Sequence, residues 1–223
     1  MGKLFVIEGV DGAGKATQTK KLFDRLSDEG RDPLMVSFPD YDSKSSDIVK
    51  MYLAGDFGKN ASDVDAKTAS TFFAIDRYVS YKTKWGADYE SGRLVIADRY
   101  TTSNMVHQAS KIDSDSEKEE FLDWLCDYEY GIYKLPKPDL TLFLDMPPEY
   151  GYKLTRDRAN KITGDMVQDI HEKDRAYIKK SYDNALFVAK KLGWDIIECV
   201  RNGEIRTIED IADEIYAKAE KYI

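Results

Sequence analysis

The residues best suited to chemistry form a glycine-rich stretch near the N-terminus, GVDGAGKAT from Gly9 to Thr17. Glycines let a backbone fold around an anion with its N–H groups turned inward, and the N-terminus of a following helix adds partial positive charge. Lys15 supplies a full positive charge at the spacing Gly-x-x-x-x-Gly-Lys. The pattern predicts a loop that binds the phosphates of a nucleotide. The predicted contact residues are Gly9, Gly12, Ala13, Gly14, Lys15, Ala16 and Thr17.

One position departs from the usual form of this loop. Ala16 stands where a serine or threonine hydroxyl commonly holds a magnesium ion. Thr17 follows directly, but on a helix it points about 100° away from that position. Water or a carboxylate elsewhere therefore has to complete the shell of the metal. The alternative interpretation is a degenerate loop without activity.

A second group with chemical potential follows the apolar stretch 94–97. Asp98 is expected at the C-terminal end of that strand, and open α/β sheets bind ligands beyond the carboxyl ends of their strands. A carboxylate there can hold Mg²⁺ or its waters, and Arg99 beside it can clamp a phosphate. A structural ion pair between Asp98 and Arg99 is the alternative.

Two further stretches have the side chains to recognise a base and a sugar. Phe73 and Arg77 are four residues apart on a predicted helix, 65–85, and share a face, so a ring could stack on a base while a guanidinium bonds its edge. Hydrogen-bonding side chains crowd residues 101–108, directly after the strand that ends at Asp98. The alternatives are that Phe73 belongs to the core, that Arg77 is a surface charge, and that His107 is structural.

A basic cluster lies in the C-terminal half of this acidic chain. Arg156, Arg158 and Lys161 precede the turn-like residues 163–165. The cluster predicts a lid over phosphates around residues 154–168. The alternative is a solvated helix face on which Asp157 balances the charge.

The elements that must position these residues can be read from the apolar runs. Runs at 4–7, 33–38, 94–100, 140–145 and 194–200 lack strict alternation, which favours parallel strands covered on both faces. Amphipathic stretches predict helices at about 15–30, 47–53, 65–85, 121–130, 147–158 and 169–192, and after Thr207. We therefore expect an α/β, three-layer P-loop NTPase fold, in which helices flank a five-stranded parallel sheet. We expect residues 1–223 to form a single domain.

Composition narrows the class of protein. The chain of 223 residues has a formal net charge of -8 and a pI near 5.0, which argues against a nucleic-acid partner. Cys126 and Cys199 are far apart and lack the spacing of a metal site. No apolar run approaches membrane-spanning length, and Met1 runs almost directly into the first predicted strand. We expect a soluble, cytoplasmic protein without a membrane partner.

Taken together, several stretches resemble the thymidylate kinase family, P-loop nucleoside-monophosphate kinases that phosphorylate dTMP. They are residues 8–18, 38–39, 73–77, 98–100 with 103–104, 136–139 and 169–172. The resemblance runs nearly the full length of the chain and keeps the order of the motifs. It implies ATP as the phosphate donor, Mg²⁺ as the metal and a homodimer.

The resemblance also implies roles at the phosphates. The loop would hold the donor's phosphates, Asp11 would meet the sugar 3′-hydroxyl or the phosphate–metal assembly of the acceptor, and Arg99 would grip the acceptor phosphate. Gly12, not a basic residue, follows Asp11, which resembles family members whose catalytic arginine comes from the lid. The implied catalytic residues are Lys15, Asp11, Arg99, Arg156 and Arg158, and the implied metal ligands are Asp98 and Asp11.

At the nucleoside, the resemblance implies that Phe73 stacks on thymine and that Arg77 and Asn104 read its polar edge. Phe38 would wall the pocket, and His107 stands where the family often has an aromatic residue beside the 2′ position of the sugar. The full implied substrate set is Asp11, Phe38, Tyr41, Phe73, Arg77, Arg99, Ser103, Asn104, His107, Gln108, Asp169 and Glu172, the last two at the far end of the lid.

One departure concerns the acceptor phosphate. Many family members have an arginine near Phe-Pro, whereas Asp40 and Tyr41 follow Pro39 here, and the Tyr41 hydroxyl could donate a hydrogen bond but lacks the positive charge of an arginine. The expected reaction is transfer of the γ-phosphoryl group of ATP to dTMP. The alternatives are a kinase for another nucleoside monophosphate or a deoxynucleoside, and a non-catalytic nucleotide-binding sensor.

Overall fold

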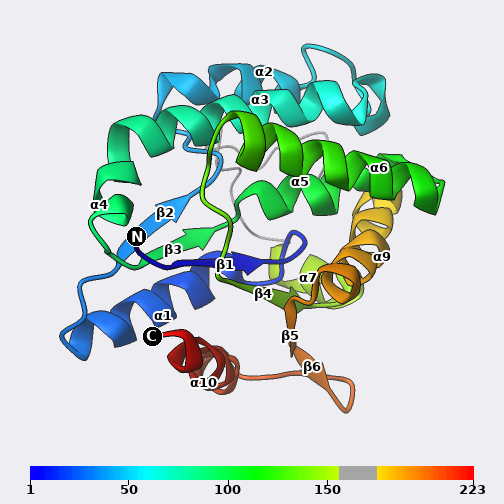
Figure 1. Ribbon diagram of the computed structural model, residues 1–223. Helices are drawn as coiled ribbons and strands as arrows, with labels where there is room; N and C mark the ends of the chain where they lie inside the picture. Colours follow the sequence, from blue (N-terminus) through cyan, green and yellow to red (C-terminus); the bar gives the residue numbers. More distant parts are fainter. Residues whose placement is uncertain (156–174) are drawn as a thin grey trace.

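The computed structural model describes residues 1–155 and 175–223, and a five-stranded parallel sheet forms its centre (Figure 1). The strands are β1 (Leu4–Glu8), β2 (Leu34–Ser37), β3 (Val95–Asp98), β4 (Leu140–Asp145) and β5 (Asp195–Glu198), in the order β2-β3-β1-β4-β5. In the register, Ile7 of β1 pairs with Asp98 of β3 and with Leu142 of β4. The predicted α/β fold and parallel sheet are confirmed.

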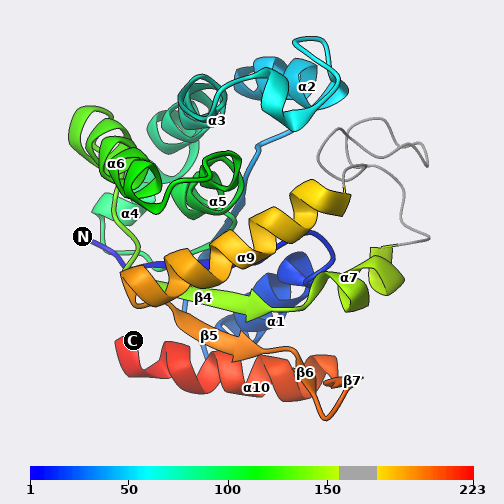
Figure 2. The ribbon, with the colours of Figure 1, turned by 90° about the vertical axis from the view of Figure 1, so that its right-hand side faces the viewer.

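Helices cover both faces of the sheet (Figures 1 and 2). On one face lie α1 (Lys15–Asp28) and α10 (Ile208–Ala219). On the other face lie α2 (Asp47–Ala54), α3 (Ala66–Ser80), α5 (Thr101–His107), α6 (Asp115–Cys126) and α9 (Arg175–Leu192), with α4 (Gly86–Glu90) at the end of the layer. Helix α7 (Pro148–Thr155) lies beyond the carboxyl end of β4 (Figure 2). The three-layer arrangement follows the prediction.

The alternation of side chains along β1 explains why the sheet is apolar on both faces. Phe5 and Ile7 pack toward α1 and α10, whereas Leu4 and Val6 join the cluster around Trp85. All five residues of β1, including Glu8 at its end, are fully buried. A strand buried on both sides reads as a continuous apolar run, which is the pattern that β1 shows.

The element boundaries differ from the predictions in several places, and α6 begins at Asp115, before the predicted start at 121. The predicted helix 65–85 is α3 followed by a π-helical turn, Tyr81–Trp85, and α6 likewise continues into a π-helical segment, η5 (Asp127–Ile132). The fifth predicted strand ends at Glu198, and a short hairpin of β6 (Val200–Arg201) and β7 (Glu204–Ile205) follows it. Within the described residues, no helix is both long enough and apolar enough to cross a membrane.

Candidate active site

The glycine-rich loop connects β1 to α1, as the sequence predicts. Gly12 and Gly14 have φ of 84° and 85°, the left-handed region that glycine enters without strain. Gly14 precedes the first residue of α1, and no side chain caps that end of the helix. The N–H groups at the start of α1 therefore stay available to an anion.

Lys15 is folded back over this loop. Its Nζ donates a hydrogen bond to the carbonyl oxygen of Val10 at 2.9 Å, and its side chain is buried. Burial and the charge of Arg99 together lower the pKa of Lys15 to about 8, although nearby carboxylates oppose the shift. Lys15 therefore stays mainly protonated at neutral pH, and its present partner is a neutral carbonyl that a phosphate oxygen could replace.

Helix α7 lies directly against the loop. A Cβ placed on Gly12 would lie 2.6 Å from the carbonyl oxygen of Gly151, and one on Gly151 would lie 3.0 Å from the carbonyl oxygen of Asp11. The backbones of the loop and of α7 thus touch where two glycines face each other. The loop is held by main-chain packing against the helix that leads toward residue 156.

Arg99 reaches the loop from the end of β3. Its backbone has φ 69°, which is rare for a residue other than glycine. Its Nη2 donates to Asp11 Oδ1, while its Nη1 lies 3.0 Å from His107 Nε2 and 3.4 Å from Ser103 Oγ. Burial works to lower the pKa of Arg99, but the carboxylates around it, foremost Asp11 and Glu8, raise the pKa above its ordinary value. The structure thus brings together Asp11 and Arg99, two residues to which the resemblance gives separate roles at the acceptor.

Glu8 is the residue of this region that sequence reasoning missed. Its carboxylate is fully buried and accepts hydrogen bonds from the Gly9 N–H at 2.9 Å and from the hydroxyls of Thr102 and Ser103 at 2.7 Å each. It also lies 3.6 Å from Arg99 Nη1. Glu8 thereby joins the start of the loop to the start of α5. A lone acid at the end of an otherwise apolar strand was the available signal.

Asp98 fits the predicted role of a metal ligand. Its side chain is 6% exposed, and it accepts no side-chain hydrogen bond from the residues that the structure describes, although it lies close enough to Lys15 to raise that pKa. No ion pair joins Asp98 to Arg99 in the described part of the chain, so the alternative of a structural pair between them is not supported. No group of three or more acids, histidines or cysteines forms a metal cage among the described residues. That arrangement suits Mg²⁺, which commonly uses one or two carboxylates together with substrate phosphates and water.

The residues predicted to read the base form a second cluster. Arg77 is almost fully buried and makes a bidentate ion pair with Glu129 of η5, with Nε to Oε2 at 2.6 Å and Nη2 to Oε1 at 2.5 Å. Asn104 Nδ2 donates to the same carboxylate at 3.2 Å. The alternative that Arg77 is a surface charge is therefore wrong. Phe73, four residues before it on α3, is half-buried and meets Tyr52 edge-on, with the ring centroids 6.0 Å apart.

Helix α5 carries residues of both clusters. Ser103 and His107 face Arg99, whereas Asn104 faces Glu129. His107 is also stacked on Tyr177 of α9, with the ring centroids 6.4 Å apart. Gln108, the other predicted contact on this stretch, is buried, and its Oε1 has no hydrogen-bond partner within the described residues.

The remaining predicted residues fall into three groups. Phe38 is buried and packs against Tyr100, and the Tyr41 ring lies near enough to Arg99 to contribute to its raised pKa. Asp139, from the motif at 136–139, instead binds Lys3 Nζ and the Leu4 N–H, so it holds the start of β1. Arg156, Arg158, Asp169 and Glu172 lie outside the described residues.

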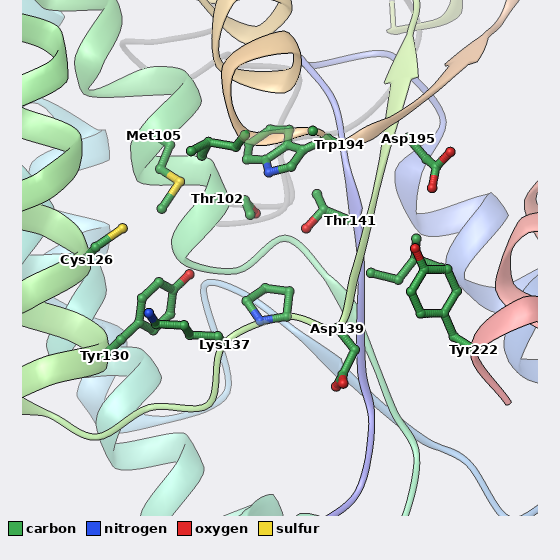
Figure 3. Close-up of a pocket in the computed structure, with 14 residues that line it drawn as sticks. Thr102, Met105, Cys126, Tyr130, Lys137, Asp139, Thr141, Trp194, Asp195 and Tyr222 are labelled. Carbon is green, nitrogen blue, oxygen red and sulfur yellow. The ribbon is translucent and has the colours of Figure 1, made fainter.

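A cavity of about 280 Å³ lies away from this site (Figure 3). Its walls include Met105, Tyr130 and Trp194, together with Leu140 and Asp195 at the starts of β4 and β5. The loop, Asp98 and Arg99 instead lie at the carboxyl ends of the parallel strands, which form the opposite edge of the sheet. The cavity is therefore separate from the candidate active site.

Comparisons with known proteins agree with this geometry. The family model for thymidylate kinase matches residues 7–202. A thymidylate kinase of Mycobacterium tuberculosis is 34% identical over 174 residues, which cover 77% of this chain and 78% of the relative. A thymidylate kinase of Danio rerio is 26% identical over 224 residues, 99% of this chain and 94% of the relative. The fold matches the structure of thymidylate kinase from Candida albicans with a TM-score of 0.70 at 22% identity, over 99% of this chain and 92% of that one. The protein described here belongs to the thymidylate kinase family.

Proposed function

We propose that this protein transfers the γ-phosphoryl group of ATP to dTMP, giving dTDP and ADP. The observation that carries the proposal is the meeting of Lys15, on the glycine-rich loop, with Arg99, at the end of β3, around the Asp11 carboxylate. Lys15 follows β1 and Arg99 follows β3, so two cations lie at the same edge of the sheet. This arrangement suits a reaction that brings the phosphates of a donor and of an acceptor together. Membership of the family supplies the identity of the acceptor.

Phosphoryl transfer depends mainly on positioning and on neutralising negative charge, so it needs fixed cations more than a general base. In the proposed mechanism the loop amides and Lys15 hold the phosphates of ATP. Arg99 exchanges part of its contact with Asp11 for the phosphate of dTMP. Asp11 then accepts a hydrogen bond from the sugar 3′-hydroxyl.

We propose Mg²⁺ as the accompanying metal, with Asp98 and Asp11 as its protein ligands. When bound, the metal would neutralise charge between the two nucleotides' phosphates. The Asp98 carboxylate has the open oxygens that a metal ligand requires. Ala16 has no hydroxyl to bind the metal, and we do not assign that role to the exposed Thr17. The lid around residues 154–168, with Arg156 or Arg158 completing the charge around the transferred group, stays a prediction.

The test is ADP formation from Mg-ATP with dTMP, dUMP, dGMP, dAMP, UMP and thymidine as acceptors. We expect dTMP to have the highest kcat/KM and thymidine to be inactive, because Arg99 needs a phosphate already present on the acceptor. Preferred turnover of another monophosphate would reassign the acceptor while keeping the mechanism. ATP binding without turnover of any acceptor would overturn the proposal in favour of a sensor.

A second copy of this chain is the partner that we propose. Ile75 and Tyr78 on α3 are 40% and 36% exposed, and Ile132 on η5 is 70% exposed. The two elements meet where the Tyr78 ring contacts the ring of Tyr133, which follows Ile132. Exposed apolar side chains that gather on neighbouring elements favour burial against another surface. Light scattering should give twice the mass of one chain, and a monomer at all concentrations would contradict the dimer. A cytoplasmic location and the absence of a nucleic-acid partner stay predictions from composition.

A further inference from the structure

We propose that Glu129 sets the direction of the hydrogen bonds that Arg77 and Asn104 offer to the base of the acceptor. Through this effect Glu129 selects a base whose edge presents a carbonyl oxygen beside an N–H. The inference rests on the proposed function and concerns the same acceptor site. Glu129 acts through its neighbours, as a positioning residue that determines specificity.

The Glu129 carboxylate is fully buried and receives four hydrogen bonds. Oε1 accepts from Arg77 Nη2 at 2.5 Å and from Asn104 Nδ2 at 3.2 Å. Oε2 accepts from Arg77 Nε at 2.6 Å and from the Thr101 hydroxyl at 2.8 Å. Three residues donate these four bonds, so both oxygens of the carboxylate act as acceptors. Burial raises the pKa values of Tyr100 and Tyr130, and the negative charge of Glu129 raises them further.

The orientation of the Asn104 amide follows from its two partners. Nδ2 lies 3.2 Å from Glu129 Oε1 and 3.2 Å from the carbonyl oxygen of Ser70 on α3. A carboxylate and a peptide carbonyl can only accept, so the amide must turn its NH₂ group toward both. The opposite atom, Oδ1, is left as an acceptor, and no described residue donates a hydrogen bond to it.

In the described part of the chain, Arg77 keeps one unused donor, which complements the open acceptor of Asn104. Nε and Nη2 are both used by Glu129, and no hydrogen bond within the described residues uses Nη1. The cluster therefore has one open donor, on Arg77, and one open acceptor, on Asn104. Phe73 lies one helical turn before Arg77 on the same face of α3, where its ring can support a stacked base.

A donor beside an acceptor matches one edge pattern among the pyrimidines. Thymine and uracil present a carbonyl oxygen next to an N–H, whereas cytosine presents an amino group next to a bare ring nitrogen. Cytosine would set donor against donor at Arg77 and acceptor against acceptor at Asn104. Buried polar groups left unpaired in this way reject a wrong substrate strongly, by a factor of about 1,000 or more.

The variant Glu129→Gln keeps the shape of the side chain and changes its hydrogen bonding. One of the two oxygens becomes an NH₂ group: in place of Oε1 it would face both Arg77 Nη2 and Asn104 Nδ2, and in place of Oε2 it would face Arg77 Nε and the Thr101 hydroxyl. Arg77 cannot become an acceptor, but the Asn104 amide can turn over at the cost of its bond to Ser70. Turning over places NH₂ toward the base, which suits the bare ring nitrogen of cytosine.

The experiment measures kcat/KM for dTMP, dUMP and dCMP with the wild-type protein, Glu129→Gln and the control Thr101→Val. The control removes one hydroxyl that donates to Glu129 and leaves the bonds to Arg77 and Asn104 in place. We expect Glu129→Gln to narrow the dTMP-to-dCMP ratio by about tenfold or more, mainly through KM. The dTMP-to-dUMP ratio should not change, because these bases share the same edge. Thr101→Val should keep both ratios.

A folded Glu129→Gln protein with the wild-type dTMP-to-dCMP ratio would overturn the inference while leaving the proposed function intact. Absence of dTMP turnover by the wild-type protein would instead overturn the proposed function. If Glu129→Gln does not fold, the wild-type protein still tests the direction of the bonds with N3-methyl-dTMP, which lacks the N–H. Turnover of that analogue at the rate of dTMP would overturn the inference, and loss of turnover by about 100-fold would support it.

Discussion

The two ends of the proposed acceptor site hold their arginines in different ways. At the phosphate end, the Arg99 side chain is 18% exposed and pairs with Asp11, which is itself 28% exposed. At the base end, Arg77 and Glu129 are 2% and 0% exposed, and two parallel hydrogen bonds join them. One arginine is held by a partner within reach of water, and the other by a partner sealed from it.

The difference corresponds to what each end has to do in a catalytic cycle. A phosphate must enter, react and leave, so Arg99 and Lys15 keep partners that a phosphate oxygen can replace: a half-exposed carboxylate and a neutral carbonyl. The edge of the base stays the same throughout the reaction. A permanent buried carboxylate at that end keeps the donors and acceptors fixed between turnovers.

The largest effect on activity is expected at the phosphate end. Lys15→Met removes the cation that faces the donor's phosphates, and kcat for dTMP should fall about 1,000-fold or more. Lys20→Met is the matched control, because Lys20 lies on the exposed face of the same helix and, among the described residues, pairs with Asp24 alone. Circular dichroism should show both variants folded. Near-normal turnover by Lys15→Met would show that residues 9–17 do not form the phosphate-binding loop.

The contrast between the two arginines can be tested through stability. Arg77→Met leaves Glu129 as a buried charge without its ion pair, which should cost about 3–5 kcal/mol and lower the Tm by roughly 10 °C. Arg99→Met breaks the partly exposed pair with Asp11, and the buried Glu8 keeps its three hydrogen-bond donors, so the expected cost is smaller, about 1 kcal/mol. Equal losses of Tm, measured by calorimetry on the two variants, would show that the ends are not built differently.

The smallest predicted effect concerns the backbone of the loop. Gly12→Ala and Gly14→Ala impose the same left-handed strain of about 1–2 kcal/mol, but only Gly12 has the backbone of Gly151 against its Cβ position. The contact should cost Gly12→Ala a further ~1–3 kcal/mol, a few degrees in Tm. The same Tm for both variants would mean that α7 does not constrain the phosphate end.

Much of the phosphate end could be predicted from the sequence, because its signals are local. The loop 9–17 is continuous in the chain, and Asp98 follows a recognisable apolar strand. Parallel strands bring their carboxyl ends to one edge, so the meeting of Asp11 with Arg99, 88 positions later, follows from topology. The five-stranded parallel sheet was predictable for the same reason.

The buried acids could not be predicted in the same way. Glu129 lies 52 positions from Arg77, next to a surface helix that carries many other acids. Its only signal is its place between Tyr128 and Tyr130. Glu8 stood at the end of an apolar strand, but its partners Thr102 and Ser103 are set by how α5 packs on β1. Such pairings depend on tertiary contacts that no spacing rule encodes.

The acids around the phosphate end also give the site an electrical preference. Lys15 and Arg99 share their surroundings with Glu8, Asp11 and Asp98, so within the described residues three carboxylates face two cations. A bare nucleotide polyanion thus approaches an excess of negative charge at close range. On the proposed function, we expect the cluster to admit a nucleotide that carries a counter-ion more readily than one that arrives alone, and so to act as a filter for the metal-complexed form of the substrate.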